Sequence, residues 1–126
     1  AGWGSNNPAF RTFFTSSFIP DATVQQASSF DELQRVSTSA KNGARIQQMN
    51  GTVDVSELAK QLKIPCLVLH CEGDQITPHD EGRRMAALIP GSQFVTLEGN
   101  NHALIENTPA FDKFVLEVTN FVKGLS

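Results

Sequence analysis

The alternation of apolar and polar positions is clearest in the second half of the chain. An unbroken apolar run, Cys66 to Leu69, follows Pro65 and ends before a turn at Gly73. Such a short run is typical of a strand that is covered on both faces in a parallel sheet, and a buried helix segment is the alternative. Residues 93–97 have the composition of a second strand. The pattern therefore predicts two strands with one helix between them.

Helix-start signals surround the second predicted strand. Thr77 precedes Pro78 and stands three positions before Asp80, which predicts a capped helix that reaches Ile89. Thr108 and Pro109 predict a last helix that ends at Gly124. Its apolar residues recur at three- and four-residue spacing: Phe111, Phe114, Val115, Val118, Phe121 and Val122. We expect the strand-helix-strand unit to close as a parallel, right-handed crossover.

The first half of the chain has no convincing strand. One helix is expected from Pro8 through Phe18, a second from a capping box at Thr23 to about Val36, and a third from Ser39 to a left-handed cap at Gly51. The inward side of the second helix is expected to carry Val24, Ala27, Phe30 and Leu33. The third helix has a poor apolar face and should be peripheral. Residues 1–55 thus form a helical segment and residues 56–126 a strand-helix segment, within one structural unit.

Composition narrows the class of protein. The 126 residues are 40% hydrophobic and 18% charged, which is ordinary for one ordered domain. A net charge of −3 disfavours nucleic-acid binding, and no apolar run is long enough to predict a membrane span. Cys66 and Cys71 should lie on opposite faces of the first strand, roughly 16 Å apart and too far for a disulfide. Unpaired thiols and the lack of a signal peptide at the start predict a cytoplasmic protein.

Two residues with catalytic chemistry follow the two strands. Asp74 comes directly after the first strand, and His102 follows the second in a loop with Gly99 and Asn101. Because the carboxyl ends of parallel strands share one edge of a sheet, these side chains should meet there. An aspartate that orients a histidine is the acid and base half of a nucleophilic triad. The alternatives are a plain turn residue and a plain loop histidine.

The other polar and aromatic candidates have simpler interpretations. We expect His70 to be packed or hydrogen-bonded within its strand and His79 to be solvated. The three histidines lack zinc-site spacing, so neither a metal nor a cofactor is expected. Trp3, Phe10 and Phe14 are either packing groups or the lining of an apolar substrate site.

Several of these segments together resemble a known family. The run from Pro65 to Asp74, the tripeptide Ile89-Pro90-Gly91 and the run from Glu98 to His102 resemble the C-terminal part of the α/β-hydrolase family. Residues 2–4, 7–10 and 30–35 are similar to a bacterial branch that also occurs joined to LuxR-type transcription regulators or nucleotide cyclases.

The resemblance implies a fold and a set of roles. The fold is a partial α/β-hydrolase: a small, mainly parallel sheet flanked by helices, with an N-terminal helical cap over the active site. The acid role is carried to Asp74 and the base role to His102. Since this cap would cover the active site, Trp3, Phe10 and Phe14 are the candidates for substrate binding.

The resemblance supplies no nucleophile. The family's elbow, Gly-x-Ser-x-Gly, is absent because no two glycines of this sequence lie four positions apart. We therefore expect a fragment, a truncated product or a piece of a longer protein, inactive by itself on ester, lactone or similar substrates. The alternatives are a ligand-sensing or protein-interaction module and a site completed by a partner chain. An orphaned strand edge should also favour a homodimer or swapped assembly.

Overall fold

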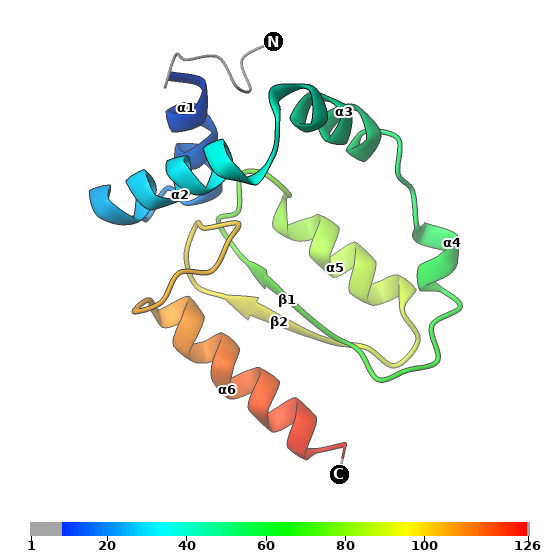
Figure 1. Ribbon diagram of the computed structural model, residues 1–126. Helices are drawn as coiled ribbons and strands as arrows, with labels where there is room; N and C mark the ends of the chain where they lie inside the picture. Colours follow the sequence, from blue (N-terminus) through cyan, green and yellow to red (C-terminus); the bar gives the residue numbers. More distant parts are fainter. Residues whose placement is uncertain (1–8, 126) are drawn as a thin grey trace.

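The structure, a computed structural model, describes residues 9–125. Trp3 and Pro8 lie outside the described residues. Along the chain the elements are α1 (Ala9–Phe18), α2 (Val24–Ser37), α3 (Ala40–Asn50), α4 (Ser56–Ala59), β1 (Leu67–Cys71), α5 (His79–Leu88), β2 (Gln93–Leu97) and α6 (Pro109–Lys123) (Figure 1).

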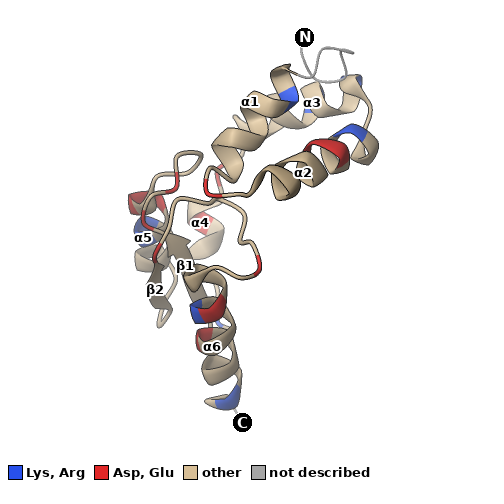
Figure 2. Ribbon diagram, turned by 90° about the vertical axis from the view of Figure 1, so that its left-hand side faces the viewer, with Lys and Arg blue, Asp and Glu red and all other residues tan. Residues whose placement is uncertain are grey.

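The two strands form a parallel sheet. Leu67 of β1 stands opposite Gln93 of β2, and the register continues to Cys71 opposite Leu97. This confirms a strand rather than a helix for the apolar run. Helices α5 and α6 both contact the sheet and lie on opposite sides of it (Figures 1 and 2). The expected fold class, a small parallel sheet flanked by helices, is confirmed.

The strands divide their side chains between the two helices, as alternation requires. On the α6 side, Leu97 is only 1% exposed and packs with Cys71 and Ala110. On the α5 side, His70 lies under Gly82, where an added Cβ atom would stand 2.3 Å from His70 Nδ1. Glycine at this position therefore lets α5 approach β1 closely.

Most of the predicted helix starts are confirmed. The predicted cap at Thr77 and the predicted left-handed conformation of Gly51 are wrong. Thr23, Ser39 and Thr108 are N-caps whose side chains accept backbone N–H groups. Helix α5, however, has Pro78 at its N-cap position and no side-chain cap, because proline has no polar side-chain group to offer. The backbone groups of Thr77 bond instead to the side chains of His70 and Asp74. Gly51 does end α3, but with a right-handed φ of −68° rather than in the left-handed region.

Helices α1 and α2 pack against each other through polar groups. Gln34 is buried and its Nε2 donates to Thr15 Oγ1 at 2.7 Å, and Thr15 in turn donates to Asp31. The expectation that Val24 and Leu33 face inward is wrong, since they are 89% and 57% exposed. The polar contacts rotate α2 so that these apolar side chains face outward.

The helices that precede β1 are set apart from the sheet. Helices α1 and α2 lie beyond the carboxyl ends of the strands, and α3 contacts no other helix or strand of the described chain, as expected of a peripheral helix (Figures 1 and 2). Basic residues are spread over α1, α2, α3, α5 and α6 (Figure 2). Over residues 9–125, every helix falls short of the length and apolar character that crossing a bilayer needs.

Candidate active site

Asp74 is held by a tight turn at the end of β1. Backbone pairing continues past the strands, because Glu72 N donates to Leu97 O and Gly73 N to Gly99 O, each at 3.0 Å. Asp74 then folds back on its own turn, and its Oδ1 accepts the backbone N–H groups of Ile76 at 2.8 Å and Thr77 at 3.1 Å. One carboxylate oxygen is thereby fixed, and Oδ2 is left to point away from the turn.

His102 is presented by the loop that follows β2. Gly99 has a φ of 123°, a backbone conformation that suits glycine, and it turns the chain back toward the Asp74 turn. Asn101 is buried and accepts the backbone N–H of Asp21 through Oδ1. The backbone N–H of His102 donates to Phe18 O at 2.8 Å. Hydrogen bonds of Asn101 and of the His102 backbone therefore fix the loop that carries the imidazole.

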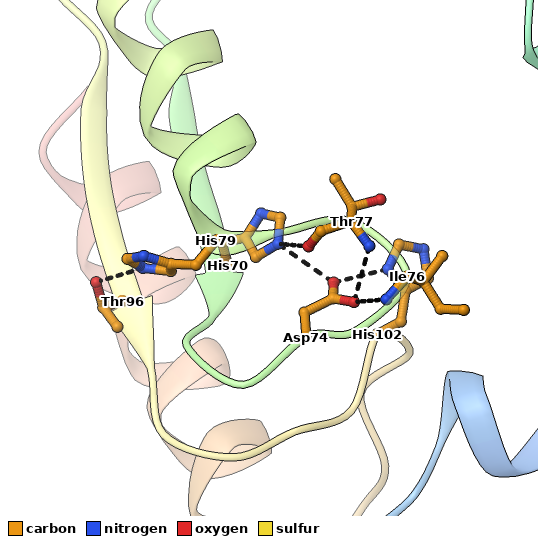
Figure 3. A network of polar contacts seen from close by, with 7 residues as sticks. All are labelled: His70, Asp74, Ile76, Thr77, His79, Thr96 and His102. Carbon is orange, nitrogen blue, oxygen red and sulfur yellow. Dashed lines mark hydrogen bonds and ion pairs between the residues drawn. The ribbon is translucent and has the colours of Figure 1, made fainter.

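The predicted acid and base meet at this edge of the sheet (Figure 3). His102 Nδ1 lies 2.7 Å from Asp74 Oδ2, the distance of a charge-assisted hydrogen bond. Since a carboxylate only accepts, Nδ1 carries the proton and Nε2 is the basic nitrogen of the neutral ring. The Asp74 side chain is 4% exposed and that of His102 33%. Among residues 9–125, Nε2 has no hydrogen-bond partner, so it is open to a further group.

A second histidine supports the same carboxylate. His70 Nε2 donates to Thr77 O at 2.8 Å and lies 3.2 Å from Asp74 Oδ2 (Figure 3). The expectation of a hydrogen-bonded strand histidine is confirmed, but its contact with the acid could not be foreseen from the sequence. Both histidines thus approach the same carboxylate oxygen of Asp74, Oδ2.

The prediction that His79 is solvated is wrong. Its Nε2 lies 3.0 Å from Thr96 Oγ1, and its ring packs edge-on against His70 and Phe94. These contacts arise because the first turn of α5 lies directly over the even-numbered side chains of the sheet. His79 has no contact with Asp74 and belongs to the packing between α5 and the sheet.

The surroundings favour the ionised form of Asp74. Burial acts to raise its pKa, but the hydrogen bond from His102, those from the backbone of Thr77 and Ile76, and the charge of His102 together lower it below the ordinary value. The acid is therefore a carboxylate at neutral pH and can stabilise an imidazolium at His102.

This lowered pKa predicts a pH dependence of stability. The folded state binds fewer protons at Asp74 than the unfolded chain does, whose aspartates titrate near about pH 4. The free energy of unfolding should therefore fall as pH drops from about 5 toward 3. In urea titrations across this range, Asp74→Asn should flatten the decline, and Glu106→Gln, at an exposed carboxylate in the loop before α6, serves as the control. Equal slopes for Asp74→Asn and the parent chain would contradict this account.

A groove of about 450 Å³ joins this pair to the strand that precedes it. It is lined by Leu67–Cys71, the whole of β1, together with Asp74, His102, Leu97, Leu104 and Phe114. In the described chain, β1 pairs with β2 along one edge only. The groove thus runs beside a strand with an unused edge and ends at the acid and base.

Two of the predicted substrate-binding aromatics, Phe10 and Phe14, do not line this groove, and Trp3 lies outside the described residues. Phe10 is 39% exposed. Phe14 stacks on Phe18 with ring centroids 4.2 Å apart, and Phe18 in turn meets the His102 ring edge-on at 4.9 Å. Phe18 is therefore the aromatic residue at the site. The sequence feature that could have identified Phe18 is its position, one helical turn after Phe14 and just before the turn at Pro20.

Cys71 lacks the features of a nucleophile. Both thiols are free, as predicted. Burial, with the nearby carboxylates of Asp74, Asp21 and Glu72, raises the pKa of Cys71, which keeps it protonated and unreactive. In the described part of the chain, no three His, Cys, Asp or Glu side chains are grouped so that they could hold a metal ion.

Sequence comparison links this chain to known proteins. Residues 35–118, which include Asp74 and His102, match the family described as TAP-like protein. A pyrrolizixenacetamide deacetylase from Xenorhabdus hominickii is 32% identical over 79 residues, 63% of this chain and 29% of that protein. The non-heme chloroperoxidase CPO-A1 from Kitasatospora aureofaciens is 31% identical over 83 residues, 65% of this chain and 30% of that protein.

Solved structures share the fold over nearly the whole chain. A bromoperoxidase from Bacillus anthracis superposes with a TM-score of 0.82 at 21% identity, over 94% of this chain and 45% of that one. The esterase RhEst1 from Rhodococcus sp. ECU1013 gives 0.74 at 25% identity, over 97% and 45%. An esterase from Exiguobacterium antarcticum gives 0.80 at 18% identity, over 94% and 43%. The chain spans less than half the length of these structures and less than a third of the relatives above.

Proposed function

Because the chain belongs to the TAP-like family of α/β-hydrolases, we propose that it forms the cap and the acid–base half of a hydrolase active site. The observation that carries this proposal is the 2.7 Å hydrogen bond from His102 Nδ1 to Asp74 Oδ2, with Nε2 left open. In chain order this half corresponds to the C-terminal part of a family member. Asp74 is the acid and His102 the base.

The proposed chemistry is acyl hydrolysis. His102 Nε2 takes the proton of a serine hydroxyl as that oxygen attacks the acyl carbon, and later returns the proton to the leaving group. Asp74 holds the imidazole in the required tautomer and stabilises the imidazolium. A deacetylase and esterases among the related proteins support this substrate class. Phe18, with Phe10 and Phe14 behind it, would form the apolar wall on the cap side.

The nucleophile comes from outside these residues. Gly-x-Ser-x-Gly is absent from the sequence, so the serine and the oxyanion hole belong to another segment. The unused edge of β1 and the groove beside it are where a further parallel strand would bring that segment to His102. By itself the chain is therefore expected to be inactive.

Intact mass spectrometry after incubation with a fluorophosphonate probe tests this proposal. The 126-residue chain is expected to gain no adduct, and His102→Ala should behave identically. A stoichiometric adduct that disappears in His102→Ala would show that a serine within the chain is activated. It would overturn the proposal that the nucleophile lies in another segment.

Ligand sensing is the second candidate function, because the sequence resembles the family branch that also occurs joined to transcription regulators. A cavity of about 600 Å³ lies between α2 and residues 103–106 and is lined by polar and apolar side chains alike. This volume is within the range of small-molecule sites. A short-chain acyl ester that raises the melting temperature equally in the parent chain and in Asp74→Asn would favour sensing over catalysis.

In the isolated chain, the open edge of β1 is expected to recruit a second copy. Unpaired backbone groups on an edge strand favour pairing with another strand, and the apolar groove beside Leu67–Cys71 adds to this tendency. Light scattering coupled to size-exclusion chromatography should give twice the mass of the chain, as a homodimer or swapped assembly. A monomer at all concentrations would contradict this prediction.

A further inference from the structure

We propose that Asp21 is a positioning residue that fixes the His102 loop to the cap helices. Asp21 lies in the turn between α1 and α2, and its contacts are with residues 79 and 80 positions later in the chain. The inference rests on the proposed function only in that His102 is the catalytic base. The contacts themselves stand without it.

Asp21 and the loop bond to each other in both directions. The Asp21 carboxylate accepts the backbone N–H of Asn100 at 2.9 Å and the Asn100 side-chain amide at 2.9 and 3.1 Å. In return, the backbone N–H of Asp21 donates to Asn101 Oδ1 at 3.0 Å. Hydrogen bonds to an ionised acceptor are stronger than hydrogen bonds between neutral groups. Because Asp21 both accepts from the loop and donates to it, these bonds fix the position and the orientation of the loop relative to Asp21.

The same turn also bonds to His102. Phe18 O accepts the backbone N–H of His102 at 2.8 Å and that of Ala103 at 3.3 Å, and the Phe18 ring meets the imidazole edge. The end of α1 and Asp21 thus bond to every residue from Asn100 to Ala103. No other part of the cap helices bonds to this loop among the described residues.

The loop has little freedom on its other side. Gly99 O accepts Gly73 N, and a Cβ atom at Gly73 would lie 2.1 Å from Asn100 Oδ1. The loop is therefore enclosed between the Asp74 turn and Asp21. Among residues 9–125, α1 and α2 contact no strand and neither α5 nor α6, and the hydrogen bonds that join them to the His102 loop come from this turn and the end of α1.

Hydrogen exchange and imidazole NMR on the whole chain test the inference. In Asp21→Ala, the backbone amides of Asn100 and His102 should exchange about tenfold faster or more, in line with the loss of a charge-assisted bond. The Nδ1 proton of His102 should broaden or vanish. Glu98→Gln removes a neighbouring exposed carboxylate that has no bond to the loop, and should change neither signal.

A milder variant keeps the test decisive if Asp21→Ala fails to fold. Asp21→Asn retains one oxygen for the Asn100 N–H and should give a smaller acceleration in the same two amides. Amide exchange and Nδ1 signals identical to those of Glu98→Gln would overturn the inference. Asp74→Asn separates the two claims. If Asp74→Asn leaves the NMR signal of the His102 ring unchanged, the assignment of the acid–base pair is wrong. If Asp74→Asn changes that signal and the Asp21 variants do not, the acid–base pair stands and the role proposed for Asp21 is wrong.

Discussion

A fluorophosphonate-reactive serine is expected when this chain is joined to a hydrolase segment that carries the elbow Gly-x-Ser-x-Gly. In that hybrid, His102→Ala should slow labelling by about 10²–10⁴-fold, the usual contribution of a general base. The reason is that Nε2, with Nδ1–H held by Asp74, is the group that would remove the serine proton in the proposed mechanism. Labelling rates followed by intact mass give the measurement.

A second histidine supplies the control for this prediction. His79→Ala removes an imidazole that bonds to Thr96 and has no contact with Asp74, so its labelling rate should stay close to that of the parent hybrid. If His102→Ala were labelled as fast as His79→Ala, then His102 would not be the base.

The largest effect on stability is expected at Leu97. This side chain is 1% exposed, packs with Cys71 and Ala110, and precedes the His102 loop. Leu97→Ala removes buried methyl groups and leaves a cavity, which costs roughly 2–5 kcal/mol in the free energy of unfolding. Urea denaturation at fixed protein concentration measures this cost.

Leu116 provides the matched surface substitution. It is 58% exposed on α6, so Leu116→Ala should change the free energy of unfolding by no more than about 0.5 kcal/mol. Equal costs at the two positions would mean that the sheet and α6 do not form the core described here.

The sequence predicts the part of the site that depends on local signals. The short apolar run, the turn glycines and the helix-start residues specify two parallel strands, and parallel strands bring Asp74 and His102 to one edge. The sequence therefore predicts that these two side chains meet, and the hydrogen bond between them confirms it. The small sheet flanked by helices follows from the same pattern.

The remaining features depend on contacts between distant segments. Asp21 bonds to Asn100 across 79 positions, and no local pattern marks that pair. Val24 and Leu33 were expected inside by helical spacing alone, but the polar contact of Gln34 sets the orientation of α2 instead. Thr77 matches a cap motif, yet Pro78 takes the N-cap position of α5, and the Thr77 backbone bonds to Asp74 and His70. No local sequence pattern marks these hydrogen bonds.

The most direct test of the acid–base pair is the tautomer of the His102 ring, read by ¹⁵N NMR of the whole chain at a pH where the ring is neutral. The structure predicts that the proton then lies on Nδ1, held in a hydrogen bond to Asp74 Oδ2. In Asp74→Asn that preference should be lost, because an amide can present a donor to Nδ1. A proton on Nε2 in the parent chain, or the same spectrum in Asp74→Asn, would contradict the assignment of Asp74 as acid and His102 as base.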